Sequence, residues 1–301
     1  RAGADRSRAA AAPPVTGAAL ALVIPSAAAH AGWNLLAKQS GGGLPYIWLG
    51  GVLSLGVLIP ASAIATLAAG EELGLSATAA AWMLGAAAIH GTYFFTLQSG
   101  YRAADLSVVY PLARGSGPLL SFIAAILLLG ESPGVLQVLG AATIVGAVLA
   151  LGLSAARRAP HDRSGIAWAL TTGGLIATYT LWDKHGVDGL DVQPIAYLCG
   201  VEIGRALIFL PLVMRRRDEL AAEWRHKRRN LLGFAAMAPL SYVLFLFALS
   251  LAPVTLVAPL RELSILFGVA LGGQFLAEGH TRTRALAAVA IVAGVSAVSI
   301  G

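Results

Sequence analysis

Two arginines in apolar stretches, Arg114 and Arg261, are the residues most able to bind a charged ligand. Each follows a proline closely, Pro111 or Pro259, and Glu262 comes directly after Arg261. An arginine at membrane depth costs about 2.5–3.5 kcal/mol on insertion scales unless it faces protein or water. A guanidinium can hold a carboxylate or a phosphate through two hydrogen bonds. We therefore predict that both arginines bind an anionic group, although neutralising acids and capping proline-freed carbonyls would explain them equally well.

Further polar and aromatic residues lie in apolar stretches of both halves of the chain. Tyrosines would supply apolar walls with hydroxyl tips, and a histidine can act as a ligand or proton carrier, although lone membrane histidines are more often packing residues. Besides the two arginines, the predicted substrate-binding residues are Asn34, His90, Tyr93, Tyr110, Tyr179 and Tyr242.

A second group consists of candidates for proton transfer or ion pairing. Glu202 and Arg205 are three residues apart, so they can pair on one helix face, and burial would raise the pKa of Glu202 toward physiological pH. Glu262 and His30 complete this group. Three buried cations (Arg114, Arg205 and Arg261) would then face two buried acids, which favours an anionic group on the ligand.

The sequence carries no signature of a metal, a cofactor or ATP. No Walker A motif, HExxH motif, CxxC motif or paired catalytic carboxylates occur, and the only cysteine, Cys199, excludes an internal disulfide. The net charge of +6 comes from loop Lys and Arg, which predicts contact with anionic membrane lipids rather than nucleic acid. We expect no cofactor, no metal and no ATPase subunit.

The elements that carry these residues are predicted to be transmembrane helices. The chain of 301 residues is 57% hydrophobic and 12% charged, whereas soluble domains have about 25% charged residues. Apolar runs separated by turn and charge signals predict about ten spans. They are 17–38, 45–69, 77–100, 104–129, 133–155, 164–184, 192–214, 230–250, 253–277 and 282–300.

Landmark residues recur at a nearly constant distance, which indicates a duplication. Trp33 and Trp182 are 149 residues apart, as are Tyr93 and Tyr242, and Pro111 and Pro259 are 148 apart. We predict an N-terminal tail (1–16), a first five-helix repeat (17–155), a linker (156–163) and a second five-helix repeat (164–301). Because five is odd, the second repeat must be inverted in the membrane, so the fold class is an all-α polytopic membrane protein with two inverted repeats.

The loop charges predict an orientation. Fourteen of the 21 Lys and Arg lie on the side opposite the N-terminus: Lys38, Arg102, Arg157, Arg158, Arg163, Arg215, Arg216, Arg217, Arg225, Lys227, Arg228, Arg229, Arg282 and Arg284. The positive-inside rule then places both termini in the periplasm of a bacterial inner membrane. Residues 215–229 would form a cytoplasmic interfacial segment with Leu220 and Trp224 toward lipid.

Two segments resemble the EamA family of the drug/metabolite transporter superfamily. They are HAGWNLLAK, His30 to Lys38, and PLLSFIAAILLLGE, Pro118 to Glu131, which resembles the proline-apolar-Gly-Glu end of the family's fourth helix. The second repeat departs from the pattern, since Ile265 replaces the proline and Gly279 follows Glu278. The resemblance implies two inverted five-helix repeats and a transporter that exports amino acids or other small metabolites.

The predicted function is therefore secondary transport of a small metabolite, with an amino acid as the favoured substrate. The two halves of the protein would rock around a central site. Transport of phosphorylated or nucleotide-linked metabolites is the alternative, because guanidinium groups also bind phosphate. A membrane-embedded enzyme acting on lipid-linked substrates is a weaker alternative, since the acids are scattered rather than clustered at one membrane face. A scaffold would have no use for buried Arg and Glu.

Overall fold

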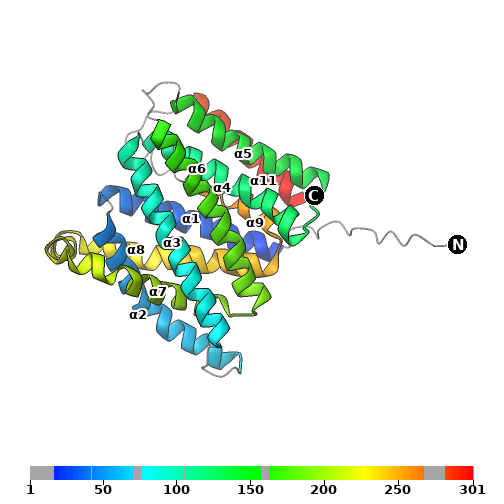
Figure 1. Cartoon of the computed structure of the whole chain (residues 1–301). Coiled ribbons are helices and arrows are strands. Elements are labelled where there is room, and N and C mark those ends of the chain that lie inside the picture. Colours follow the sequence, from blue (N-terminus) through cyan, green and yellow to red (C-terminus); the bar gives the residue numbers. More distant parts are fainter. Residues whose placement is uncertain are drawn as a thin grey trace.

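The computed structural model describes residues 17–41, 43–70, 76–104, 106–156, 163–267 and 282–300. This part of the chain is all-helical and contains no strand (Figure 1). The predicted tail, residues 157–162 of the predicted linker, and Glu278 lie outside the described residues. The helices begin and end close to the predicted spans in most cases, so the helical membrane class is confirmed.

The helices follow one another with short connections. Their bounds are α1 Gly17–Gln39, α2 Leu44–Ala68, α3 Ala77–Ala103, α4 Leu106–Leu129, α5 Val135–Ala156, α6 Arg163–Lys184, α7 Pro194–Met214, α8 Arg217–Leu251, α9 Val254–Leu260 and α11 Arg282–Ile300, with a π-helical turn, η1 His185–Gly189, after α6. Five helices of the described part are long and apolar enough to cross a membrane: α1, α2, the segment Leu112–Leu129 of α4, α7 and α8. Segments of α5 and α11 form shorter apolar helices.

The predicted span 253–277 is interrupted in its described part. α9 ends at Leu260, Arg261 and Glu262 form a turn, and helix resumes at Leu263. Pro259 explains the break, because it has no N–H to donate and its ring crowds the preceding turn. The amide of Glu262 donates instead to the carbonyl of Pro259 (3.0 Å), a tighter turn than in an α-helix. The break therefore places two charged residues, Arg261 and Glu262, in a tight turn between two helical pieces.

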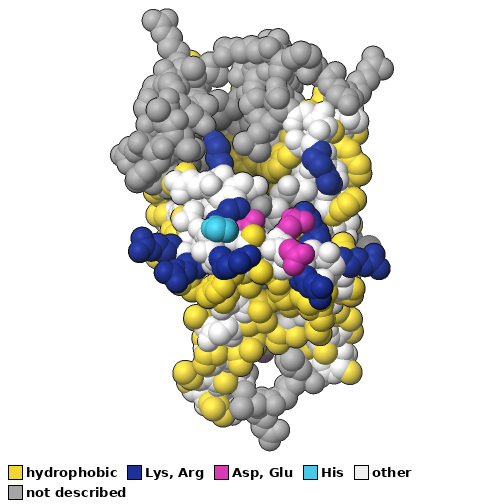
Figure 2. Space-filling view, turned by 90° about the vertical axis from the view of Figure 1, so that its left-hand side faces the viewer, with side chains coloured by type: hydrophobic (Ala, Val, Ile, Leu, Met, Phe, Trp, Pro, Cys, Tyr) yellow, Lys and Arg dark blue, Asp and Glu magenta, His cyan; other side chains and the backbone are white. Residues whose placement is uncertain are grey.

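α8 is longer than predicted, because it joins the predicted interfacial segment to the predicted span. Lys227 has a non-helical φ of −127° and ψ of 19°, which marks a kink between the two parts. Before the kink, the side chain of Trp224 is exposed. Figure 2 shows Lys and Arg side chains in a band across this end of the molecule, next to an apolar surface. The basic band is in keeping with a segment that lies at a membrane surface.

Helices from the two halves of the chain pack in pairs. α1 packs along α8, α3 along α6, α2 along α7 and α5 along α11, and the α1–α8 and α5–α11 pairs can be followed in Figure 1. α5 and α11 approach most closely at Gly140 and Gly294, where an added Cβ would lie 2.6–2.7 Å from the carbonyl oxygen of the other glycine. Such contact between backbones requires glycine.

Two of these pairs are joined by reciprocal hydrogen bonds. In the α1–α8 pair, the hydroxyl of Ser26 donates to the carbonyl of Ser241 (2.7 Å), and the hydroxyl of Ser241 donates to the carbonyl of Ser26 (2.9 Å). In the α3–α6 pair, the indole N–H of Trp82 donates to the carbonyl of Trp182, and that of Trp182 to the carbonyl of Trp82, both at 2.9 Å. The two indoles are stacked, with 3.9 Å between centroids.

Candidate functional site

The break after α9 brings two charged residues against α4. Nη2 of Arg114 lies 3.1 Å from the hydroxyl of Ser264 and 3.3 Å from Oε1 of Glu262. Arg114, Arg261, Glu262 and Ser264 are all buried. These four residues are called the arginine cluster below. The cluster joins α4 to the start of the second helical piece, so each half of the chain contributes to it.

Arg261 is held by aromatic rings rather than by an acid. The centre of its guanidinium lies 4.1 Å from the ring of Phe245 and 5.1 Å from the ring of Tyr242, both on α8. Cation–π contacts of this kind stabilise by about 0.5–2 kcal/mol and leave the N–H groups available. Among the described residues, Arg261 has no carboxylate within ion-pair distance.

Several buried polar atoms of this region have no hydrogen-bond partner in the described structure. They are Nε of Arg114, Nε of Arg261, Oε2 of Glu262 and Nδ1 of His30. An unpaired buried polar atom costs about 1–3 kcal/mol, and more when it is charged. Four such atoms therefore lie together in this region of the described structure.

His30, Tyr93 and Tyr110 lie within electrostatic range of both arginines. Tyr93 in turn contacts the ring of Tyr179 edge-on, with centroids 5.5 Å apart. Helices α1, α3, α4 and α6 thus each carry a predicted residue in this region.

A second polar centre lies beside the first, at Asp183 on α6. Its carboxylate is fully buried and accepts hydrogen bonds from the hydroxyls of Tyr197 (2.8 Å, to Oδ1) and Tyr242 (to Oδ2). Nε2 of His90 lies 2.9 Å from the same Oδ2. His90, Asp183, Tyr197 and Tyr242 are called the Asp183 cluster below. Tyr179 stacks on His90 with 4.5 Å between centroids, which covers the outer face of the imidazole.

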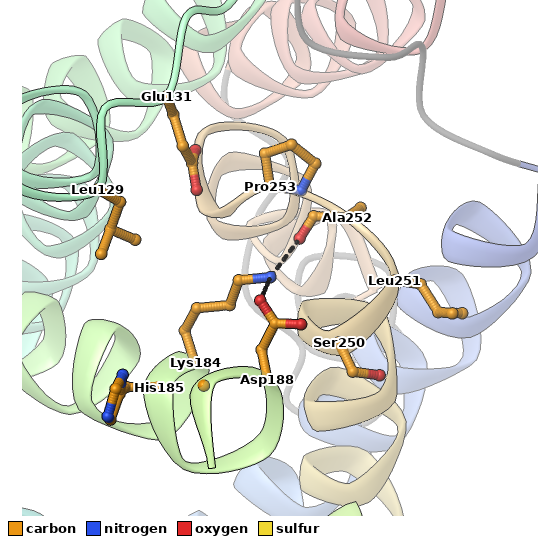
Figure 3. A pocket seen from close by; sticks show the side chains of 10 residues that line it. Leu129, Glu131, Lys184, His185, Asp188, Ser250, Leu251, Ala252 and Pro253 are labelled. Atoms are coloured by element: carbon orange, nitrogen blue, oxygen red, sulfur yellow. Dashed lines mark hydrogen bonds and ion pairs between the residues drawn. The ribbon is translucent and has the colours of Figure 1, made fainter. Parts of the chain in front are cut away.

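A pocket opens at the end of the molecule where α4, α6 and α8 end and α9 begins. It has a volume of ≈ 460 Å³, and Figure 3 shows Lys184 and Asp188 on one wall and Glu131 on another. Nζ of Lys184 donates to the carbonyl of Leu249 (2.6 Å) and pairs with Asp188 (3.0 Å).

Glu131, on the other wall of this pocket, caps α9. Its Oε1 accepts from the amide of Val254 and its Oε2 from the amide of Thr255, both at 2.8 Å. These amides have no partner within the helix, and a carboxylate is favourable at the positive end of the helix dipole. The Glu at the end of the fourth helix therefore fixes the helix that leads to Arg261.

Comparisons with known proteins place the chain in a family. A family model described as "EamA-like transporter family" matches residues 163–300. Residues 163–300 belong to the EamA-like transporter family. This family implies a membrane transporter of the drug/metabolite type, and the apolar helices agree with a multi-pass membrane protein. The predicted family is thus confirmed for the second half of this EamA-like chain.

The fold is also that of solved structures. Twenty-eight solved chains match. One, described only as "Crystal structure of protein", matches with a TM-score of 0.71 and 17% sequence identity, over 94% of this chain and 97% of that chain. At this identity the likeness shows the fold alone. The search of curated proteins found no match.

The structure of this EamA-like protein brings most of the predicted residues together. His30, Tyr93, Tyr110, Arg114, Arg261 and Glu262 lie around the arginine cluster, and His90, Tyr179 and Tyr242 lie around Asp183. Asn34 does not point into either cluster through its amide, because Nδ2 donates to the carbonyl of His30 in its own helix (2.6 Å).

Glu202 and Arg205 form the predicted ion pair, but away from both clusters. The pair packs against α2, where a Cβ on Gly51 would lie 2.8 Å from Oε2 of Glu202 and 2.9 Å from Nη2 of Arg205. Arg205 forms an ion pair with Glu202, and the thiol of Cys199 lies within range of the Glu202 charge. The proton role predicted for Glu202 stays a prediction, since this position favours a structural pair between α2 and α7.

Sequence reasoning undervalued Asp183, which it left out of the site. The predicted span ended at residue 184, and the buried acids counted from the sequence were Glu202 and Glu262 alone. The described buried acids number three, Asp183, Glu202 and Glu262, whereas the buried arginines are Arg114 and Arg261, because Arg205 is partly exposed. The expected excess of one buried cation is therefore wrong, and the inference of a net anionic ligand loses that support.

Proposed function

We propose that this protein is a secondary transporter that carries a zwitterionic amino acid through a site formed by the arginine cluster. The unpaired Nε atoms of Arg114 and Arg261 beside the unpaired Oε2 of Glu262 are the observation that carries this proposal. Two guanidinium donors suit a carboxylate, and a nearby carboxylate oxygen suits an ammonium group. An α-amino acid offers both groups a few ångströms apart.

Charge balance favours the amino acid over a phosphorylated metabolite. Arg114 and Arg261 supply two positive charges, and Glu262 and Asp183 supply two negative ones. A zwitterion leaves this region neutral, whereas a phosphate monoester adds about two negative charges without a matching cation among the described residues. Because uncompensated charge in a buried site is costly, a neutral ligand is the better fit.

The proposed fold is about ten transmembrane helices in two inverted repeats, residues 17–155 and 164–301. The pairing of the helices supports this fold. Between the two repeats, α1 corresponds to α6 and α3 corresponds to α8; α1 packs against α8, and α6 packs against α3. Likewise α2 corresponds to α7; α2 packs against α8, and α7 packs against α3. A pseudo-two-fold axis would produce this exchange, and the α2–α7 and α5–α11 pairs would lie across it.

The proposed location is a bacterial inner membrane with both termini periplasmic, and the proposed mechanism is alternating access without ATP. The distribution of loop cations supports the orientation. The helix break at Arg261 supports the mechanism, because interrupted helices at a binding site are common in secondary transporters. Export is the proposed direction, in line with the amino acid exporters that the family resemblance implies.

A counterflow assay tests the proposed ligand. Proteoliposomes loaded with one unlabelled compound receive the same tritiated compound outside, in a panel of L-leucine, L-phenylalanine, L-threonine, L-glutamate and glucose 6-phosphate. We expect exchange of at least one neutral amino acid and none of glucose 6-phosphate. Arg114→Ala and Arg261→Ala should each lower it at least tenfold, because each removes a charge-assisted hydrogen bond of about 1.5–3 kcal/mol.

The matched control is Arg216→Ala, which removes an exposed arginine paired with Glu219 on the surface. It should exchange like wild type. Normal amino acid exchange by both Arg114→Ala and Arg261→Ala would refute the site. Exchange of glucose 6-phosphate alone would refute the amino acid and favour the phosphorylated alternative.

A further inference from the structure

The Asp183 cluster contains a buried carboxylate. In the described structure, its partners are two tyrosine hydroxyls and an imidazole, which can be neutral or protonated. Its carboxylate has no exposed area and accepts from two tyrosine hydroxyls, with the imidazole of His90 as the third neighbour. The next residue, Lys184, does not neutralise it, because its Nζ is bound to the carbonyl of Leu249 and to Asp188. No Arg or Lys of the described chain forms an ion pair with Asp183.

A carboxylate in this setting is costly while it is ionised. A buried charge requires a partner of opposite charge or a full set of donors. The imidazole of His90, with Nε2 at 2.9 Å from Oδ2, is the group beside Asp183 that can become such a partner.

We propose that His90 and Asp183 together form a proton-binding site that couples proton movement to transport at the arginine cluster. The pair takes one proton from water on one side of the membrane and releases it on the other, and no other bond is made or broken. Its charge changes from −1 to 0 when the proton binds. This inference rests on the proposed function, since it assigns an energy source to the same transporter.

Tyr242 provides the connection between the two clusters. Its hydroxyl donates to Oδ2 of Asp183 and lies 3.4 Å from Nε2 of His90, while its ring flanks the guanidinium of Arg261. When Asp183 takes up a proton, the Tyr242 hydroxyl no longer has a charged acceptor. The position of the Tyr242 side chain therefore depends both on a proton at Asp183 and on a ligand at Arg261. A group whose position both sites influence can produce a coupling free energy between them.

The groups that face this pair from each neighbouring element are known in the described structure. Tyr179 of α6 stacks on His90, Tyr197 of α7 and Tyr242 of α8 donate to Asp183, and Tyr93 of α3 contacts Tyr179. The guanidinium of Arg261, in the turn after α9, flanks the ring of Tyr242. Its positive charge disfavours a further positive charge nearby, so we expect the pair to bind one proton and then to carry no net charge.

The test separates exchange from uphill transport in proteoliposomes. The probe is the amino acid of the panel above that wild type exchanges fastest. Counterflow at equal pH measures passage of the amino acid, and accumulation under a pH gradient of one unit, imposed in either direction, measures coupling. Wild type should accumulate the probe severalfold with one sign of the gradient. Asp183→Asn should exchange more slowly but measurably, and should not accumulate the probe with either sign.

A control and a second variant keep the test decisive if Asp183→Asn folds poorly. Asp188→Asn is the control, because it changes a half-exposed acid five residues further along the chain, and it should accumulate the probe like wild type. His90→Gln keeps a hydrogen-bond donor but carries no proton, and it should also lose accumulation. Infrared titration of the ligand-free protein should show a pH-dependent change in a carboxyl or carboxylate band that is absent in Asp183→Asn and present in Asp188→Asn.

The outcomes distinguish this inference from the proposed function. If wild type exchanges no amino acid of the panel, the proposed function fails. If wild type exchanges the probe but neither sign of the gradient drives accumulation, the function stands and the coupling is refuted. Accumulation by Asp183→Asn or His90→Gln at the wild-type level would also overturn the assignment of the proton to this pair.

Discussion

The contact between Glu131 and the start of α9 gives the sharpest prediction for stability. Both carboxylate oxygens of Glu131 accept backbone N–H groups, from Val254 and Thr255, at 2.8 Å. α9 has seven residues and ends at the break before Glu262, so it has few other bonds to hold its first turn. Glu131→Ala removes both acceptors, and Glu131→Gln leaves one acceptor oxygen and removes the charge.

The magnitude follows from the number and kind of these bonds. A hydrogen bond to a charged group contributes about 1.5–3 kcal/mol, and loss of an N-terminal cap costs about 0.5–2 kcal/mol. Because water can reach the pocket beside Glu131 and replace part of the interaction, we expect about 2–3 kcal/mol for Glu131→Ala. We expect about 1 kcal/mol for Glu131→Gln. The larger change corresponds to about 30- to 150-fold in the local opening equilibrium.

Hydrogen exchange of the α9 amides measures this opening directly. In detergent-solubilised protein, residues Val254–Leu260 should exchange about 30- to 150-fold faster in Glu131→Ala and about fivefold faster in Glu131→Gln. Glu219→Ala, which removes a surface pair with Arg216, should leave these amides unchanged. Exchange within threefold of wild type in Glu131→Ala would refute the cap, and exchange at the wild-type rate in Glu131→Gln would refute the role of its charge.

Three further predictions follow from close approaches and from the loop charges. Gly51→Ala should destabilise the protein by about 1–3 kcal/mol, because its Cβ would displace the Glu202–Arg205 pair, whereas Gly56→Ala, with open space, should be neutral; thermal unfolding of both variants compares them. Gly140→Ala should likewise lower the unfolding temperature by separating α5 from α11, and Gly146→Ala, on the same helix with open space, should not. A phosphatase fused after Gly301 should be active in the periplasm, and activity of a cytoplasm-specific reporter at that position would contradict the proposed orientation.

The helices and most of the site residues were predictable because membrane burial leaves a strong mark on sequence. Apolar runs of about 20 residues give the spans, and a charged or aromatic residue inside such a run must face protein or water. This reasoning identified Arg114, Arg261 and Tyr242: Arg261 packs on Tyr242, and Arg114 pairs with Glu262, the residue after Arg261. The same reasoning cannot show which helices are neighbours, since that depends on contacts between residues that are far apart in the sequence.

The failures have identifiable physical causes. The sequence located a weak point at Pro259, whose ring leaves a carbonyl without its donor, but apolar content does not show that the helix ends at Arg261 and Glu262. Asp183 was not counted among the buried acids, because the predicted span ended at the next residue, Lys184. The structure shows that Nζ of Lys184 donates to a carbonyl of α8, while Asp183 is fully buried beside tyrosines of α7 and α8.

The reciprocal hydrogen bonds of the paired helices have a mechanical consequence. If α1 slides along α8, both serine bonds break together, and no water is available in the hydrocarbon to replace them. The same holds for the two tryptophans between α3 and α6. We therefore infer that each pair moves as a rigid body, and that each body contains one helix from each half of the chain.

The boundary along which the protein flexes then runs between these bodies and not between the two sequence repeats. A crosslink within the α1–α8 body should leave transport intact, whereas a crosslink from α1 to α6 should stop it; the reverse result would contradict this division. The two sequence repeats and the bodies that move are therefore two different divisions of the same helices.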